Sequence, residues 1–92
     1  MNQTIHLNSE SNTVKLSEKS IRLRKKEYQL LNFLLQNKNR VIDKQSVLEF
    51  VWEHDLFSNT KTLDVHLHHL RKKLQPDIFI KTVPKQGYII ST

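Results

Sequence analysis

The clearest helical pattern of this chain lies in Leu63-Asp64-Val65-His66-Leu67-His68-His69-Leu70-Arg71-Lys72-Lys73-Leu74. Its four leucines are spaced by four, three and four residues, so they fall within about 60° of one another on an α-helix. A stripe of this kind faces a hydrophobic core. The pattern predicts a helix that begins after the cap-type residues Asn59 and Thr60 and ends near Leu74, since Pro76 follows.

The opposite face of this helix is basic and rich in histidine. Its residues are Lys61, Val65, His68 and Lys72, with His69 slightly to one side and with His66 and Arg71 at the edges of the leucine stripe. Single exposed apolar residues are common, but a purely solvated face would not usually have a valine at its centre. In a DNA major groove, valine can contact a thymine methyl group while the basic residues reach phosphates and guanine. We therefore favour a DNA-facing surface.

The composition limits the classes of protein to which the sequence can belong. Its 92 residues suffice for one domain, which we place at residues 1–92. There is no cysteine, which excludes disulfides, thiolate metal sites and cysteine nucleophiles. No apolar run approaches about 18 residues and no signal peptide opens the sequence, so we expect a cytoplasmic protein.

The chain is basic, with 15 Lys and Arg against 9 Asp and Glu and a formal net charge of +6. Residues 21–40 carry six basic groups and one acidic group, and residues 61–92 carry six and two. Residues 41–60 instead carry one basic and four acidic groups. Two basic blocks around an acidic segment favour a polyanionic partner for part of the surface.

Short strands are expected before the helices. Apolar and β-branched residues alternate or cluster in Thr4–Leu7, Thr13–Leu16 and Ser20–Leu23, and polar turn residues separate these runs. The pattern predicts an antiparallel sheet over residues 4–23, with one apolar face that must pack against another part of the domain.

A core of three helices is predicted over residues 25–75. The first helix runs from Lys25 to about Asn37 and is apolar over more than half its circumference, so it should be mostly buried. The second follows Asp43, a typical N-cap residue, and ends near Trp52. Residues 53–60 form the loop before the third helix.

A β-hairpin is predicted over residues 79–91. The runs Phe79–Val83 and Tyr88–Ser91 flank Pro84-Lys85-Gln86-Gly87, and the only glycine of the chain lies in this turn, where a positive φ is most often needed. Three helices followed by such a hairpin indicate a winged helix-turn-helix, which is an α+β fold. Its third helix enters the major groove and its wing touches the backbone or minor groove, a place that suits Lys81, Lys85 and Gln86.

Four groups of residues form a specific combination. They are Leu23-x-x-x-Glu27-Tyr28-x-Leu30-Leu31; Val41-Ile42 with Val51-Trp52; Thr62-Leu63-Asp64-Val65-His66-Leu67-x-x-Leu70-Arg71-Lys72-Lys73-Leu74; and Thr82-Val83-x-x-x-Gly87-Tyr88. Together they resemble the OmpR/PhoB-type winged-helix effector domain of bacterial response regulators. The resemblance extends from about Thr4 to Ser91, nearly the whole chain.

The resemblance implies transcription regulation through sequence-specific binding of double-stranded DNA, usually by two copies on tandem direct repeats. It also implies a four-stranded N-terminal sheet, one strand more than the sequence pattern predicts. Family members normally carry a phosphoacceptor receiver domain upstream, which is absent here. We therefore expect the C-terminal output domain of a two-component response regulator, monomeric on its own. The alternative is a stand-alone or ToxR-like membrane-tethered regulator.

The resemblance also assigns residues to the DNA interface. By position, Val65 and His69 would face bases. Phosphate or groove-edge positions would be taken by Trp52, Lys61, Thr62, His66, His68, Arg71, Thr82 and Lys85, to which the sequence pattern adds Lys72, Lys81 and Gln86. The loop with Glu53, His54 and Asp55 occupies the position where relatives contact RNA polymerase, and its acidic residues suit a protein partner. A loop that only connects two helices explains the same residues equally well.

Two departures from the family pattern affect these expectations. Arg24 and Lys25 stand where relatives usually have a Thr or Ser cap and often Pro, so the first helix should begin without its customary cap. His68 and His69 occupy positions that are commonly Arg. Arg offers guanine a permanent bidentate charge, whereas His offers one donor and a charge that depends on pH. The base preference of relatives therefore does not transfer.

Other functions have less support in the sequence. His66 and His69 are spaced as metal ligands can be, but no cysteine joins them and His68 points about 160° from His66, so we expect neither a metal site nor a cofactor. No phosphate loop, carboxylate pair or nucleophile motif indicates an enzyme. RNA binding would require exposed aromatic residues. Those of this chain are expected in the core: Tyr28, Phe33, Phe50, Phe79 and Tyr88. A winged helix that docks only proteins is the main alternative to DNA binding.

Overall fold

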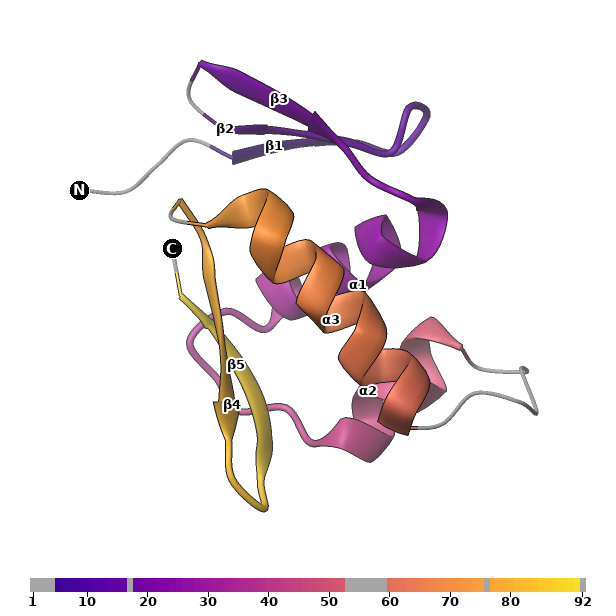
Figure 1. Cartoon of the computed structure of the whole chain (residues 1–92), viewed down its shortest axis with the longest axis vertical. Helices are drawn as coiled ribbons and strands as arrows, with labels where there is room; N and C mark the ends of the chain where they lie inside the picture. The colour runs from indigo at the N-terminus through magenta and orange to yellow at the C-terminus, as the bar shows by residue number, and fades with distance from the viewer. Residues whose placement is uncertain (1–4, 17, 53–59, 76, 92) are drawn as a thin grey trace.

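A computed structural model describes residues 5–16, 18–52, 60–75 and 77–91 of the chain (Figure 1). The elements in chain order are β1 (Ile5–Asn8), β2 (Thr13–Leu16), β3 (Lys19–Arg22), α1 (Lys25–Gln36), α2 (Lys44–Val51), α3 (Thr60–Leu74), β4 (Phe79–Val83) and β5 (Gly87–Ser91). The predicted order of three strands, three helices and a hairpin is confirmed. In Figure 1 the three-stranded sheet lies across one end of the helices and the hairpin runs along one side.

The N-terminal sheet has the strand order β1-β2-β3 and is antiparallel throughout. Val14 and Leu16 on β2 are buried, and Ile5, Leu7 and Ile21 pack against the same core, as the alternating pattern predicts. The four-stranded sheet implied by the family resemblance is wrong for the described residues. Three strands and their turns occupy the described chain from Ile5 to Arg22, and Lys25 already begins α1.

The first helix, α1, begins without a side-chain cap. As predicted, no Ser or Thr precedes the helix, and the guanidinium of Arg24 has no acceptor to offer. Instead the carboxylate of Glu27 accepts a hydrogen bond of 3.0 Å from the backbone N–H of Arg24. At the other end, the side-chain amide of Asn37 donates to the carbonyl of Phe33 at 2.9 Å. Glu27 thus supplies one half of a capping box, and Asn37 bonds one carbonyl of the last turn.

The second and third helices follow the sequence pattern closely. Asp43 is the N-cap of α2, accepting from the backbone N–H of Ser46 at 3.1 Å. The four leucines of α3 are fully buried, with 0% exposure. None of the helices within the described ranges is long and apolar enough to cross a lipid bilayer.

Two of the five aromatic residues expected in the core lie outside it. Phe50 is 59% exposed and Phe79 is 50% exposed, so their expected burial is wrong. On α2 the buried positions Val47 and Val51 are four residues apart, which leaves Phe50 on another face, where its ring stacks on Phe33 at 4.3 Å. On β4, Ile80 takes the buried face and Phe79 therefore points the other way.

The hairpin is fastened to the link before α2. Ile42 and Tyr88 form a bridge in which each backbone N–H donates to the other's carbonyl, at 2.8 and 2.9 Å. Gly87 has a φ of +148° beside this bridge. A Cβ atom at Gly87 would lie 2.0 Å from the carbonyl oxygen of Ile42, so close approach of two backbones, as well as the turn itself, requires the glycine.

Candidate nucleic-acid interface

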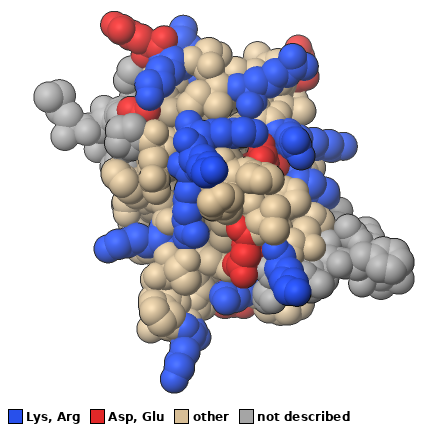
Figure 2. All heavy atoms as spheres, in the orientation of Figure 1, with Lys and Arg blue, Asp and Glu red and all other residues tan. Residues whose placement is uncertain are grey.

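The exposed face of α3 has the composition that its sequence predicts. Its outward residues Lys61, Val65, His68 and Lys72 are exposed, and His66, His69 and Arg71 are half-buried at its edges. Val65 is 53% exposed at the middle of this face. Figure 2 shows Lys and Arg side chains spread over the side of the molecule that α3 crosses, with a few carboxylates between them.

Arg71 of α3 forms hydrogen bonds with the wing, the hairpin of β4 and β5. Its Nε donates to the carbonyl oxygen of Ile80 at 2.8 Å, and its Nη2 donates to the hydroxyl of Thr82 at 2.8 Å. These bonds use two of the five N–H donors of the guanidinium. The structure thus brings together two residues that the sequence assigns separately to the interface, and it joins the wing to α3 through these two hydrogen bonds.

A second contact joins the wing to α3 from within. The hydroxyl of the buried Tyr88 donates to a carboxylate oxygen of Asp64 at 2.9 Å. Burial, together with this hydrogen bond and the charge of Asp64, raises the pKa of Tyr88 to about 12. The one acidic residue of α3 is therefore engaged by the wing, which explains why a carboxylate occurs on a basic helix.

The wing presents its polar residues to solvent. Lys81, Thr82, Lys85 and Gln86 are all exposed. Lys85 has a φ of +65°, and the backbone N–H of Gln86 donates to the carbonyl of Val83 at 3.0 Å, which closes the turn. The tip is thus a defined turn with a lysine at its end.

Trp52 lies beneath this surface. It is only 5% exposed, and the ring of His66 packs edge-on against it at a centroid distance of 5.0 Å. The Nδ1 of His66 is 2.8 Å from the carbonyl oxygen of Thr62. Behind the indole, Lys26 approaches the ring at 5.9 Å and donates to the carbonyl of Val51 at 2.8 Å. Trp52 therefore supports His66 from below.

A buried carboxylate to which the sequence pattern assigns no role lies behind the same helix. Glu27 of α1 is fully buried and accepts a 2.6 Å hydrogen bond from the ammonium of Lys73. Burial raises the pKa of Glu27, but the hydrogen bonds from Lys73 and the Arg24 N–H and the charges of Lys73 and His69 lower the pKa by more, leaving it below its ordinary value. The sequence signal was a lone acidic residue in an otherwise apolar helix face.

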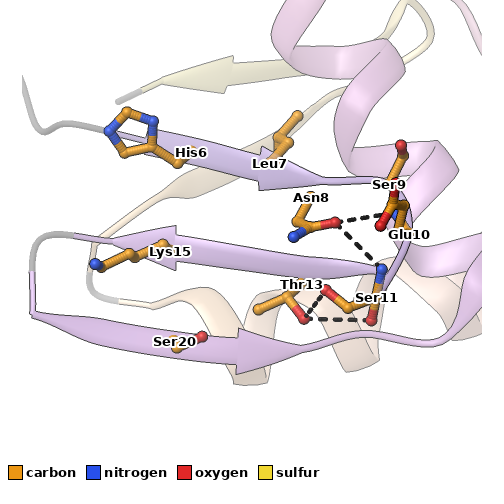
Figure 3. Close-up of a pocket in the computed structure, with 9 residues that line it drawn as sticks. All are labelled: His6, Leu7, Asn8, Ser9, Glu10, Ser11, Thr13, Lys15 and Ser20. Carbon is orange, nitrogen blue, oxygen red and sulfur yellow. Dashed lines mark hydrogen bonds between the residues drawn. The ribbon is translucent and has the colours of Figure 1, made fainter.

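A shallow hollow on the N-terminal sheet is less suited to a ligand. Figure 3 shows that its polar groups bond to one another: Asn8 accepts from the backbone N–H groups of Glu10 and Ser11, and the Ser11 hydroxyl donates to Thr13. Within the described ranges no group of His, Asp and Glu is arranged to hold a metal ion. The predicted contacts at Glu53, His54 and Asp55 lie outside the described residues.

Comparison with known proteins agrees with this geometry. The family described as "Transcriptional regulatory protein, C terminal" matches residues 18–90. The chain is 36% identical to the phosphate regulon transcriptional regulatory protein PhoB of Rhizobium meliloti (strain 1021), over 96% of this chain and 40% of that protein. It is 40% identical to the response regulator ArlR of Staphylococcus aureus (strain Mu50), over 95% of this chain and 40% of that protein.

The chain thus spans about 40% of the length of these relatives. Among solved structures, the C-terminal domain of the nisin resistance regulator NsrR superposes with a TM-score of 0.79 at 34% identity, over 92% of this chain and 89% of that domain. The chain therefore belongs to the OmpR/PhoB-type family of C-terminal, DNA-binding output domains of transcriptional regulators.

Proposed function

We propose that this domain binds specific sequences of double-stranded DNA with α3 in the major groove and the wing on the backbone or minor groove. The observation that carries the proposal is the exposed face of α3, where Val65 lies among lysines and histidines while Arg71 holds the wing alongside. Selection from random duplexes would recover a consensus sequence. Binding without a consensus, or no salt-dependent binding, would contradict the proposal.

Within this mode of binding, Val65 and His69 read bases. The residues that contact phosphates or groove edges are Lys61, Thr62, His66, His68, Arg71, Lys72, Lys81, Thr82, Lys85 and Gln86. In the free protein Trp52 is buried, and its role is to hold His66 in place. This division separates residues that set register on the duplex from those that set sequence preference.

The wing tip gives a test of the phosphate contacts. Lys85→Ala should weaken binding by a similar factor on selected and random duplexes, because a phosphate contact carries no sequence information. The slope of log K against log salt should fall in magnitude by about 0.9, the contribution of one contact. Fluorescence anisotropy at several salt concentrations measures both quantities. Lys15→Ala, an exposed lysine on β2, is the matched control and should leave the slope unchanged.

A base-reading residue should behave differently. His69→Ala is expected to relax the preference at one base pair, by less than the roughly 1–3 kcal/mol of a bidentate contact, because His offers one bond. Competition between the selected duplex and variants of it at each position measures this preference. An equal loss of affinity on selected and random DNA would assign His69 to the backbone instead.

For the whole protein we propose the following context. The relatives named as response regulators suggest that the domain serves a two-component system, in the cytoplasm and without enzymatic activity of its own. Two copies would bind tandem direct repeats, although the isolated domain is monomeric. The acidic segment 41–60 supports a contact with RNA polymerase through Glu53, His54 and Asp55, which stays a prediction. A stand-alone or membrane-tethered regulator is the alternative context.

A further inference from the structure

Within the described residues, Glu27 is the one charged side chain that is fully buried. Its two carboxylate oxygens have different surroundings. Oε1 accepts hydrogen bonds from the backbone N–H of Arg24 at 3.0 Å and from the ammonium of Lys73 at 2.6 Å. Oε2 is buried without a hydrogen-bond partner and lies 3.7 Å from Nδ1 of His69. The unpartnered oxygen therefore faces the imidazole of a residue to which the DNA interface assigns base reading.

A buried carboxylate oxygen is costly without a donor. The facing ring nitrogen of His69 can provide one, because a shift of about 1 Å brings 3.7 Å to an ordinary charge-assisted N–H···O length of about 2.8 Å. Within the described residues no second carboxylate pairs with the ring of His69. Lys73 is held on the other oxygen of Glu27, and the ring of His68 is tilted at 5.9 Å.

The proton position on His69 determines what it can read. If Nδ1 carries the proton, the neutral ring has a lone pair on Nε2 and accepts a hydrogen bond there. The side chain of His69 is 43% exposed, so the end of the ring away from Glu27 can reach DNA. An acceptor at this point pairs with the exocyclic amino groups of cytosine or adenine and meets only acceptors on guanine.

We infer that Glu27 fixes the tautomer and orientation of His69, so that Nε2 of the neutral ring accepts a hydrogen bond from cytosine or adenine. The inference rests on the proposed function, since it concerns the specificity of the same DNA-facing helix. Glu27 is then a positioning residue: it lies in the core, contacts no DNA, and sets base preference through the imidazole.

The tautomer can be measured in the free protein, without DNA. Long-range ¹H–¹⁵N correlation spectra at pH 8 distinguish protonated from unprotonated ring nitrogens, and His69→Ala assigns the signals. We expect His69 to carry its proton on Nδ1. His68, an exposed neighbour that pairs with no carboxylate of the described residues, serves as the internal comparison. A wild-type His69 protonated at Nε2 would overturn the inference, whatever the variants do.

Glu27→Gln is expected to reverse the tautomer. The oxygen of the glutamine keeps the donors Arg24 N–H and Lys73, so its NH₂ group faces His69 and donates to Nδ1, which moves the ring proton to Nε2. At the base pair that depends on His69, selection at pH 8 should then change from cytosine or adenine to guanine or thymine, by about fivefold.

The two measurements separate the inference from the function on which it rests. If the tautomer reverses in Glu27→Gln but the base preference does not, Glu27 has no part in specificity and DNA binding stands. If the wild-type domain selects no sequence at all, the proposed function fails, and the spectrum still decides the tautomer. An unstable Glu27→Gln protein leaves the wild-type spectrum as the deciding result.

Discussion

Gly87→Ala should lower the free energy of unfolding by about 3 kcal/mol or more and the melting temperature by more than about 10 °C. Two causes add together. The φ of +148° is strained for any residue with a side chain. The new methyl group would also lie 2.0 Å from the carbonyl oxygen of Ile42 and 2.7 Å from Cα of Asp43, both backbone atoms that cannot rotate away. Thermal and urea unfolding followed by circular dichroism measure the loss.

The neighbouring position provides the control. Gln86 is exposed, and the bond that closes the turn comes from its backbone N–H, which alanine retains. Gln86→Ala should therefore change stability by no more than about 0.5 kcal/mol. If Gly87→Ala melts at the same temperature as Gln86→Ala, the bridge between Ile42 and Tyr88 does not hold the wing as described.

The parts of the fold that sequence predicted well are those set by local periodicity and by single capping residues. The leucines of α3 are buried because their spacing matches the helical repeat, whatever packs against them. Asp43 caps α2 because its side chain reaches a backbone N–H only three residues away. The hairpin could be predicted because its two β-rich runs flank a short turn with the only glycine.

The parts that sequence could not predict depend on partners distant in the chain. Glu27 and Lys73 are 46 residues apart, and neither periodicity nor propensity indicates that they meet. The sequence assigns Arg71 and Thr82 to the DNA interface separately, because nothing in their local sequence indicates that they bond to each other. Phe50 is exposed because α2 has only eight residues and buries one narrow face. Val47 and Val51 occupy that face, and Phe50 lies on another.

The structure also changes the meaning of the net charge of +6. Several basic residues make contacts within the fold. Lys26 donates a hydrogen bond to the last turn of α2, Lys73 forms an ion pair with Glu27, and Lys19 forms one with Asp77 at 2.9 Å. Arg71 is partly used by the wing. The Lys73–Glu27 and Lys19–Asp77 pairs are already balanced within the net charge of +6, so other basic residues carry that charge. Among them are the exposed Lys61 and Lys72 of α3 and Lys81 and Lys85 of the wing, where steering toward DNA would act.

The Glu27–Lys73 pair provides the second large effect. Lys73→Met keeps most of the aliphatic stem of the side chain and removes the charge, which leaves the carboxylate of Glu27 buried without its cation. Removing one partner of a buried pair typically costs 3–5 kcal/mol, and Lys73 is 35% exposed, so water replaces part of the loss. We expect a decrease in the free energy of unfolding of about 2–3 kcal/mol at pH 7, measured by urea unfolding.

The pH dependence of this loss identifies its cause. In the wild type the pKa of Glu27 lies below its ordinary 4.5, so its contribution to stability is present above pH 4.5 and disappears as pH falls through the lowered pKa. In Lys73→Met the hydrogen bond and the charge of Lys73 no longer lower the pKa of Glu27 while burial still raises it, so we expect this pKa to rise and the folded state to gain stability as the carboxylate protonates. The two proteins should therefore differ most near pH 7 and converge in acid.

Two further variants isolate the pair. Lys72→Met changes an exposed neighbour on the same helix and should alter stability by no more than about 0.5 kcal/mol at any pH. In the double variant Glu27→Gln/Lys73→Met no charge remains buried, so most of the loss at pH 7 should be recovered, because the cost came from the unpaired carboxylate. Two results would contradict this explanation: a loss of stability in Lys73→Met that does not depend on pH, or a larger loss when Glu27→Gln is added. Either would assign the effect to packing of the Lys73 stem against α1 and not to the charge of Glu27.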